Sequence, residues 1–166
     1  MKGFKSVMKT ILNDLKVELT DEFDQNFERK AFFDTPWADT KLPNPIGSLM
    51  MRTGALRDSI MSDVESEGIH FTSSVPYAAV HNEGGTFKKT ITPQMRKWAF
   101  AMFKTTKNAI YKGIALSKKD HLTITIPKRQ FIGDHPKVDE AIEQVVEANV
   151  KEYFDALMRE MGAVKG

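Results

Sequence analysis

Residues 49–85, LMMRTGALRDSIMSDVESEGIHFTSSVPYAAVHNEGG, decide the fold of this chain, because the local pattern changes several times within them. Thr53 is placed to cap a short helix, since its hydroxyl can accept a hydrogen bond from a free N–H of the first turn. Leu56 and Ile60 are four residues apart and would share one face of that helix. We therefore expect the stretch to open with a short helix that ends near Met61.

A hairpin and a second helix complete the stretch. The pair Glu67–Gly68 is typical of a turn, and apolar or small residues alternate with polar ones over 69–75, which predicts a strand with one wet face. Pro76 suits the first turn of a helix, where no N–H partner is needed. The pair Gly84–Gly85 can end that helix in a left-handed conformation. The predicted unit is helix, hairpin, helix and glycine stop.

Two long amphipathic helices are predicted on either side of this unit. The first runs from Phe4 to Arg29 and the second from about Asp134 to Glu160, because apolar residues recur every four positions in both. Asp134 is placed to cap the second helix. Ile142 and Val146 lie on its four-residue ridge, so we expect both side chains to be buried. Helices with such ridges can pack against each other and against one face of a sheet.

A second strand signal completes the fold class. Over 122–126, Leu and Ile alternate with Thr and stop at Pro127, which is typical of a strand. We expect this strand to pair with 69–74. The predicted class is α+β: two long amphipathic helices packed on a small antiparallel sheet, with a basic helical insertion. A single domain over residues 1–166 is expected from the length and the ordinary globular composition.

The insertion, about 87–119, has the weakest periodicity in the chain. Residues 93–104 predict a helix, whereas 105–119 fit either a loop or a broken helix. We expect the insertion to be mobile until a partner binds it.

The proline-rich stretch 34–48 predicts a surface loop. Trp37 lies within it, between a proline and an alanine. It either pins the loop to the core or serves as an interface anchor.

Charge is segregated along the chain. The formal net charge is only +2, but the basic segment, Thr86 to Arg129, holds eleven Lys or Arg and one acid, Asp120. Its local balance of +10 leaves −8 for the rest of the chain. Eight acids lie between Asp134 and Glu160, against three cations. Such asymmetry indicates a charged partner or a neighbouring copy of the same protein.

No motif predicts a reaction centre. The chain has no cysteine, which excludes disulfides, thiol nucleophiles and cysteine-ligated zinc. The only local cluster is His81, Asn82 and Glu83, whose spacing does not match a metal site, so no metal, cofactor or catalysis is expected. Instead, His81 and Asn82 are expected to bond loose backbone groups at the end of their helix. The alternative is an HNH-type nuclease, in which folding brings His81 near His121 or His135.

Other ligand classes are also not expected. A phosphate cradle needs glycines that lead into a helix, whereas the glycine pair here follows one. No apolar run approaches bilayer length, and the N-terminus lacks the apolar core of a signal peptide. We therefore expect no small-molecule substrate and no membrane partner, and synthesis in the cytoplasm.

Three short motifs resemble one protein family when their order and spacing are taken together. They are TGALRDSI at 53–60, VPYAAVHNEGG at 75–85 and IPKRQFIG at 126–133, followed by a final amphipathic helix. The chain resembles the phage virion morphogenesis family, which includes tail completion proteins, from about Phe27 to the C-terminus. The resemblance implies a structural protein that completes the tail or the head–tail junction as part of an oligomeric ring. It would act in the host cytoplasm during assembly and then remain in the virion.

This interpretation makes the charged and aromatic positions a candidate interface. Its residues are Trp37, His81, Asn82, Glu83, Lys88, Lys89, Arg96, Lys97, Lys118, Lys119, Lys128, Arg129 and Phe131. The expected partners are other copies of the chain and phage tail or neck proteins, with non-specific DNA contact as a further option. The alternative function is a small nucleic-acid-binding or nucleic-acid-processing protein that uses the basic segment and His81.

Overall fold

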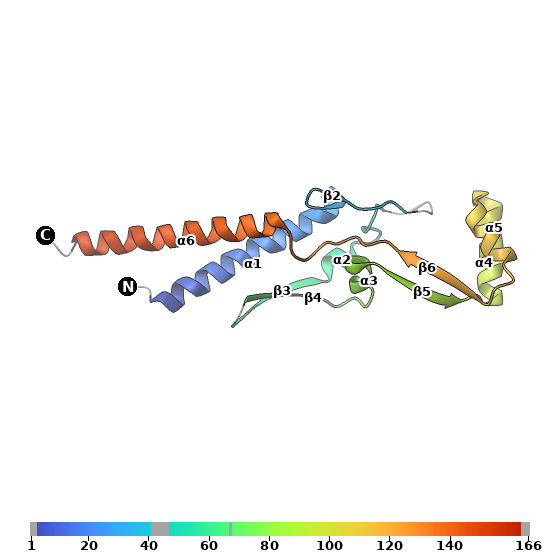
Figure 1. Cartoon of the computed structure of the whole chain (residues 1–166), viewed down its shortest axis with the longest axis horizontal. Helices are drawn as coiled ribbons and strands as arrows, with labels where there is room; N and C mark the ends of the chain where they lie inside the picture. Colours follow the sequence, from blue (N-terminus) through green and yellow to red (C-terminus); the bar gives the residue numbers. More distant parts are fainter. Residues whose placement is uncertain (1–2, 41–46, 67, 164–166) are drawn as a thin grey trace.

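The computed structural model describes residues 3–40, 47–66 and 68–163, and arranges its helices and short strands in an elongated molecule (Figure 1). In chain order the elements are α1 (Phe4–Arg29), β1 (Ala31–Phe32), β2 (Thr35–Pro36), α2 (Ala55–Asp58), β3 (Ile60–Glu65), β4 (Gly68–Ser73), α3 (Ala78–Glu83), β5 (Gly85–Thr90), α4 (Pro93–Thr106), α5 (Ala109–Leu116), β6 (His121–Ile126) and α6 (Pro136–Ala163). The predicted α+β class is confirmed. The turn residue Glu67 and the middle of the proline-rich loop, 41–46, lie outside the described residues.

Helix α1 is the central element of the core. It lies between the antiparallel helix α6 and the β3–β4 hairpin (Figure 1). Its buried apolar side chains recur every four residues and are Val7, Ile11, Leu15, Leu19, Phe23 and Phe27. The helix ends because Lys30 adopts a left-handed φ of 54° and donates its N–H to the Asn26 carbonyl. The predicted bounds of this helix are confirmed.

Helix α6 turns a different face to α1 than the periodicity predicts. Val145 and Tyr153 pack on α1, and Val146 is half-buried beside them. Ile142 is 36% exposed, so the prediction that it is buried is wrong. A ridge of residues spaced by four rotates by about 40° per step around a helix of 3.6 residues per turn. One neighbouring helix therefore cannot cover the whole ridge.

The start of α6 also differs from the prediction. His135, rather than Asp134, occupies the capping position, because its carbonyl accepts a hydrogen bond from the Val138 N–H at 2.8 Å. The Nδ1 atom of the His135 ring also accepts from the Lys137 N–H at 3.2 Å. Asp134 lies one residue too early for this role. The first helical residue is Pro136, whose missing N–H needs no partner there.

The first helix within residues 49–85 is shorter than predicted. Helix α2 ends at Asp58, and Ile60 is already the first residue of β3, where it pairs with Ser73 of β4. The helix starts after Gly54, whose φ of 80° is costly for any residue with a Cβ. The Thr53 hydroxyl accepts from the Ala55 N–H, but only at 3.4 Å. Pairing with β4 satisfies the backbone from Ile60 onward, so no second helical turn forms.

The predicted partner of the last strand is wrong. Strand β6 pairs with β5, in a register that runs from Gly85 opposite Ile126 to Thr90 opposite His121. Strand β4 instead pairs with β3, so the described strands form separate two-stranded sheets. The sequence TFKKT of β5 carries adjacent lysines and lacks the apolar alternation by which strands are recognised. The strand Gly85–Thr90 was therefore not expected.

In the second half of residues 49–85, the helix starts later than predicted but ends where predicted. Pro76 lies in the turn before α3 and not in its first helical turn, whereas Gly84 ends the helix with a φ of 77°. A Cβ on Gly84 would lie 2.8 Å from the backbone nitrogen of Lys128, so glycine is required there for space as well as for conformation.

The β5–β6 ribbon carries α4 and α5 away from the rest of the molecule (Figure 1). Helix α4 covers the predicted 93–104 and is capped by the Thr92 hydroxyl, which accepts from the Met95 N–H. Helix α5 shows that the broken-helix alternative for 105–119 was the correct one. We call residues 85–126 the distal arm. No described helix has the length and apolar character needed to cross a membrane.

Candidate functional site

The three sequence motifs meet in one core cluster. Leu56 from the first motif, Ala78 from the second and Phe131 from the third pack together with Phe27 of α1 and Trp37 of the loop. All five side chains are at most 8% exposed. These motifs therefore hold segments that are distant in the sequence in one place, and we call this cluster the motif junction.

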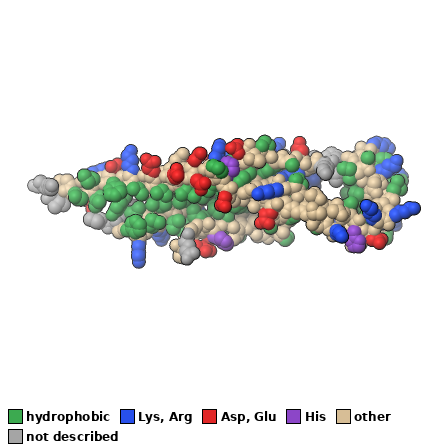
Figure 2. All heavy atoms as spheres, viewed as in Figure 1, with side chains coloured by type: hydrophobic (Ala, Val, Ile, Leu, Met, Phe, Trp, Pro, Cys, Tyr) green, Lys and Arg blue, Asp and Glu red, His purple; other side chains and the backbone are tan. Residues whose placement is uncertain are grey.

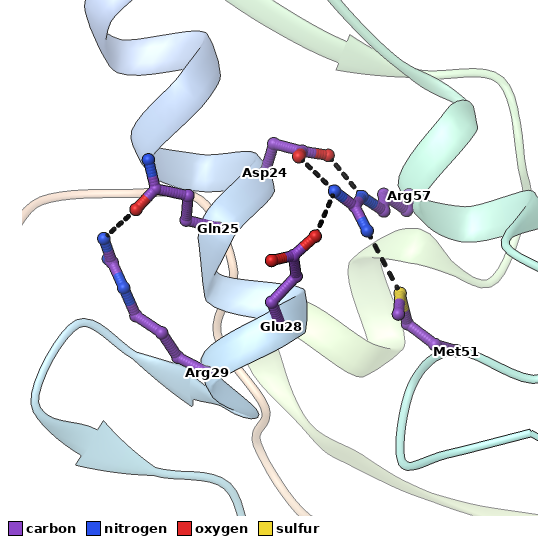
Figure 3. Close-up of polar contacts among 6 residues, drawn as sticks. All are labelled: Asp24, Gln25, Glu28, Arg29, Met51 and Arg57. Atoms are coloured by element: carbon purple, nitrogen blue, oxygen red, sulfur yellow. Dashed lines mark hydrogen bonds and ion pairs between the residues drawn. The ribbon is translucent and has the colours of Figure 1, made fainter.

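Arg57 of the first motif ties α2 to α1 (Figure 3). Its guanidinium makes a two-pronged contact with the Asp24 carboxylate, in which Nε lies 2.5 Å from Oδ1. It also donates to Glu28 at 3.0 Å and to the Met51 sulfur at 3.6 Å. Hydrogen bonds to Asp24 and then Glu28 raise the pKa of Arg57 above its usual value. The arginine thus stays charged and joins the motif to the central helix.

Replacing Arg57 with methionine is expected to lower the free energy of unfolding by about 1–3 kcal/mol, because charge-assisted hydrogen bonds are lost while the aliphatic stem is kept. Arg29→Met is the matched control. Arg29 contacts Glu22 and also Gln25 on the surface of the same helix. Figure 3 shows the contact with Gln25. Such a surface pair contributes only about 0–1 kcal/mol. Urea unfolding of both variants tests this difference. Equal losses would show that Arg57 has no special role.

Within the His81–Asn82–Glu83 cluster, the Asn82 side chain has a structural role. The Oδ1 atom of Asn82 accepts from the N–H groups of Phe131 and Ile132 at 2.9 and 3.1 Å. Asn82 therefore satisfies backbone groups of the third motif and not those at the end of its own helix, which corrects the sequence-based expectation. Glu83 is exposed.

His81 does not play the predicted part either. Its carbonyl accepts from the Arg129 N–H at 2.8 Å, but its Nδ1 atom is buried with no hydrogen-bond partner among the described residues. Burial, followed by the nearby charge of Arg129, lowers the pKa of the His81 ring. Both effects favour the neutral form of the ring.

Several predicted interface residues are in fact buried anchors. The Trp37 indole donates to the Gln130 carbonyl at 2.6 Å, which confirms that it pins the loop to the core. Arg129 is 6% exposed and donates to the carbonyls of Ala38 and Asp39 at 2.8 and 3.3 Å, while burial lowers its pKa. With Phe131 at 2% exposure, these side chains offer little surface to a partner.

A pocket of about 440 Å³ opens beside the motif junction. Tyr77, His81, Arg129 and residues of the TGALRDSI motif line it. The Arg129 guanidinium is directed at backbone carbonyls rather than at a ligand. In the described part of the chain, no group of three His, Asp or Glu side chains is arranged to hold a metal ion.

The other histidines have different surroundings. His121 lies opposite Thr90 on the distal arm, at the end of the ribbon away from Gly85. His135 stacks on Phe33 with 4.6 Å between ring centroids, and its Nε2 lies 3.2 Å from the Asp34 carboxylate. The structure gives no contact between either histidine and His81 within the described residues.

The remaining predicted interface residues lie on or beside the distal arm. Lys and Arg side chains gather on the α4–α5 end of the molecule, whereas Asp and Glu line the part formed by α1 and α6 (Figure 2). The cations predicted from the sequence are exposed or half-exposed, and they are Lys88, Lys89, Arg96, Lys97, Lys118, Lys119 and Lys128. The structure thus brings the lysines of the insertion together at one end, far from most of the acids.

Aromatic side chains lie among these cations. The Nζ atom of Lys104 lies 4.9 Å from the centre of the Phe100 ring, and that of Lys112 lies 5.8 Å from the Phe103 ring. Phe100 is 46% exposed. The surface of the arm therefore combines positive charge with exposed aromatic rings.

Comparison with known proteins places this architecture in a family. The model of the phage virion morphogenesis family matches residues 4–151, a span that includes α1, the three motifs, the distal arm and the first half of α6. Searches of curated proteins and of solved structures each found no match. Since the family model covers most of the chain and all the segments of the motif junction, the protein belongs to the phage virion morphogenesis family and has a role in assembly of the phage particle.

Proposed function

We propose that this protein is a structural component that completes the phage tail or the head–tail junction as one subunit of an oligomeric ring, without catalysis. The observation that carries the proposal is the position of the charges. Cations gather on the distal arm at one end of an elongated chain, and acids line the helices at the other (Figure 2). Family membership supports a role in the virion, and the charges suggest how copies associate.

The two charged regions favour contact between copies. Because they lie at opposite ends of the molecule, they cannot neutralise each other within one chain (Figures 1 and 2). A contact between the arm of one copy and the acidic helices of the next is head-to-tail, and such contacts close into a ring when the rotation between copies allows it. The near balance of +10 in the basic segment and −8 elsewhere fits this arrangement.

The other partners follow from the same role. Phage tail or neck proteins would contact the assembled ring, first in the host cytoplasm and later in the virion. DNA is the competing partner of the arm, because interleaved cations and exposed aromatic rings also suit phosphates and unstacked bases. In that case the protein would bind nucleic acid rather than a neighbouring subunit.

Reversing four arm lysines separates these possibilities. Lys88, Lys89, Lys118 and Lys119 are changed together to Glu, and the molar mass is measured by light scattering across salt concentrations. We expect the wild-type protein to form a salt-sensitive oligomer and the variant to remain monomeric. Gel retardation of DNA is measured in parallel.

A matched control changes the same four lysines to Arg. It keeps the positive charge of the arm and should leave the oligomer largely intact. If the arm variant keeps its oligomeric state but loses DNA retention, the nucleic-acid function is correct and the ring proposal is wrong.

A further inference from the structure

Helix α6 exposes apolar side chains along one side, most of them in its C-terminal half. They recur at spacings of three, four or eight residues, so they follow one side of the helix. We call this face the α6 stripe, and its residues are Ile142, Val150, Phe154, Met158 and Met161, which are 36–66% exposed. Val145, Val146 and Tyr153, on the adjoining side of the helix, already pack on α1. Exposed apolar surface of this extent is typical of an interaction site.

Carboxylates border the α6 stripe. Glu143 and Glu147 lie one turn before the half-buried Val146 and the exposed Val150, and Asp155 lies one turn before Met158. Lys151 also lies in this region, so the border is acidic in balance. Two copies of this stripe would face carboxylates against carboxylates, which is unfavourable. The suitable partner is an apolar surface that is bordered by cations.

The tip of the distal arm has that composition. Phe100 is 46% exposed, and Lys97 and Lys104 lie three and four residues from it on the same side of α4. The Lys104 ammonium is already 4.9 Å from the ring centre. Further exposed apolar side chains on α4 and α5 are Trp98, Ile110 and Leu116, at 50%, 41% and 65%.

We propose that the α4–α5 tip of one copy docks on the α6 stripe of the next copy, with Phe100 against apolar side chains and Lys97 and Lys104 against Glu143 and Glu147. This inference rests on the proposed function and names the surfaces that carry it. The β5–β6 ribbon, six residues per strand, holds the tip about 20 Å from the motif junction. The tip and the stripe lie at opposite ends of the chain, so they can meet only between copies (Figure 1). Each subunit thus makes two such contacts, one through its own α4–α5 tip and one through its own α6 stripe.

Mixing two defective variants tests this contact. The arm variant carries Lys97→Glu, Phe100→Ser and Lys104→Glu, and the stripe variant carries Glu143→Gln, Glu147→Gln and Phe154→Ser, so the two altered surfaces cannot form ion pairs with each other. Each variant alone should need at least about tenfold higher concentration to associate, because both lose a central aromatic side chain and the ion pairs of the contact. Mixed in equal amounts, they should form a one-to-one dimer and nothing larger, because only one intact contact remains. Analytical ultracentrifugation measures these masses.

Further measurements keep the outcomes distinct. All the changed side chains are exposed, so the melting temperature should stay close to that of the wild-type protein. If the arm variant associates as well as the wild-type protein, copies contact through another surface, and the inference is wrong while the ring proposal stands. A wild-type protein that stays monomeric at every concentration and salt would overturn both. A mixture that remains monomeric, with both variants folded, would overturn the inference alone.

Discussion

Replacing Phe27 with alanine is expected to lower the free energy of unfolding by about 3–5 kcal/mol, which is a large part of the total stability of a domain of this size. The Phe27 side chain is 0% exposed at the centre of the motif junction. Its ring centre lies 5.6 Å from that of Trp37 and 5.3 Å from that of Phe131. Truncation would remove aromatic contacts to two other segments and leave a cavity between them.

Phe4→Ala is the matched control, because it makes the same truncation on the same helix at a side chain that is 74% exposed. It should change the free energy of unfolding by no more than about 0.5 kcal/mol. Thermal unfolding at equal protein concentration measures both variants. For a chain of this length each kcal/mol shifts the midpoint by about 2–4 °C, so Phe27→Ala should melt about 6–20 °C lower. A small shift for Phe27→Ala would mean that the motif junction is not the centre of stability.

Replacing Asn26 with leucine is expected to be almost as damaging, although it adds an apolar side chain to the interior. Asn26 is 0% exposed and bridges two segments. Its Oδ1 atom accepts from the Phe33 N–H at 2.9 Å, and its Nδ2 atom donates to the Phe131 carbonyl at 3.2 Å. Leucine would leave both backbone groups buried without these partners, at a cost of about 1–3 kcal/mol each.

The hydrogen bond to Phe33 has a second role. Phe33 adopts a positive φ of 53°, a conformation that is unfavourable for residues with a Cβ. Asn26 helps to hold this residue in place, so its loss should also loosen the turn between β1 and β2. Asn13→Leu is the control, since Asn13 is exposed and its side chain only donates to the Lys9 carbonyl one turn earlier. That variant should unfold at nearly the wild-type urea concentration, and a comparable loss would contradict our account of Asn26.

Helices with a strong local signal were predictable from the sequence. The four-residue recurrence of apolar side chains defined α1 from Phe4 to Arg29, and the pattern over 93–104 predicted α4. Periodicity and capping act between residues a few positions apart, so the sequence contains them directly. The same holds for Gly84, which ends α3 with a positive φ.

Strand pairing was less predictable. Strand β6 has a clear strand pattern, but its pairing with β5 rather than with β4 depends on residues about forty positions away. Strand β5 was also hard to recognise from the sequence. Both of its faces are largely exposed to solvent, so adjacent lysines replace the usual alternation of apolar and polar residues. The alternation of apolar and polar residues indicates which face of a strand is buried. It does not indicate which other strand forms the backbone hydrogen bonds with it.

For the candidate site, too, some features were predictable from the sequence and others were not. From the sequence alone, the segregation of charge and the lack of a reaction motif were evident, because they depend only on which residues are present and in what order. Only the tertiary structure decided that Trp37, Arg129 and Phe131 are buried anchors, whereas Lys97 and Lys104 lie exposed around Phe100. It also decided which apolar side chains of α6 pack on α1 and which stay exposed, because the apolar positions extend around more of the helix than one neighbouring helix can cover.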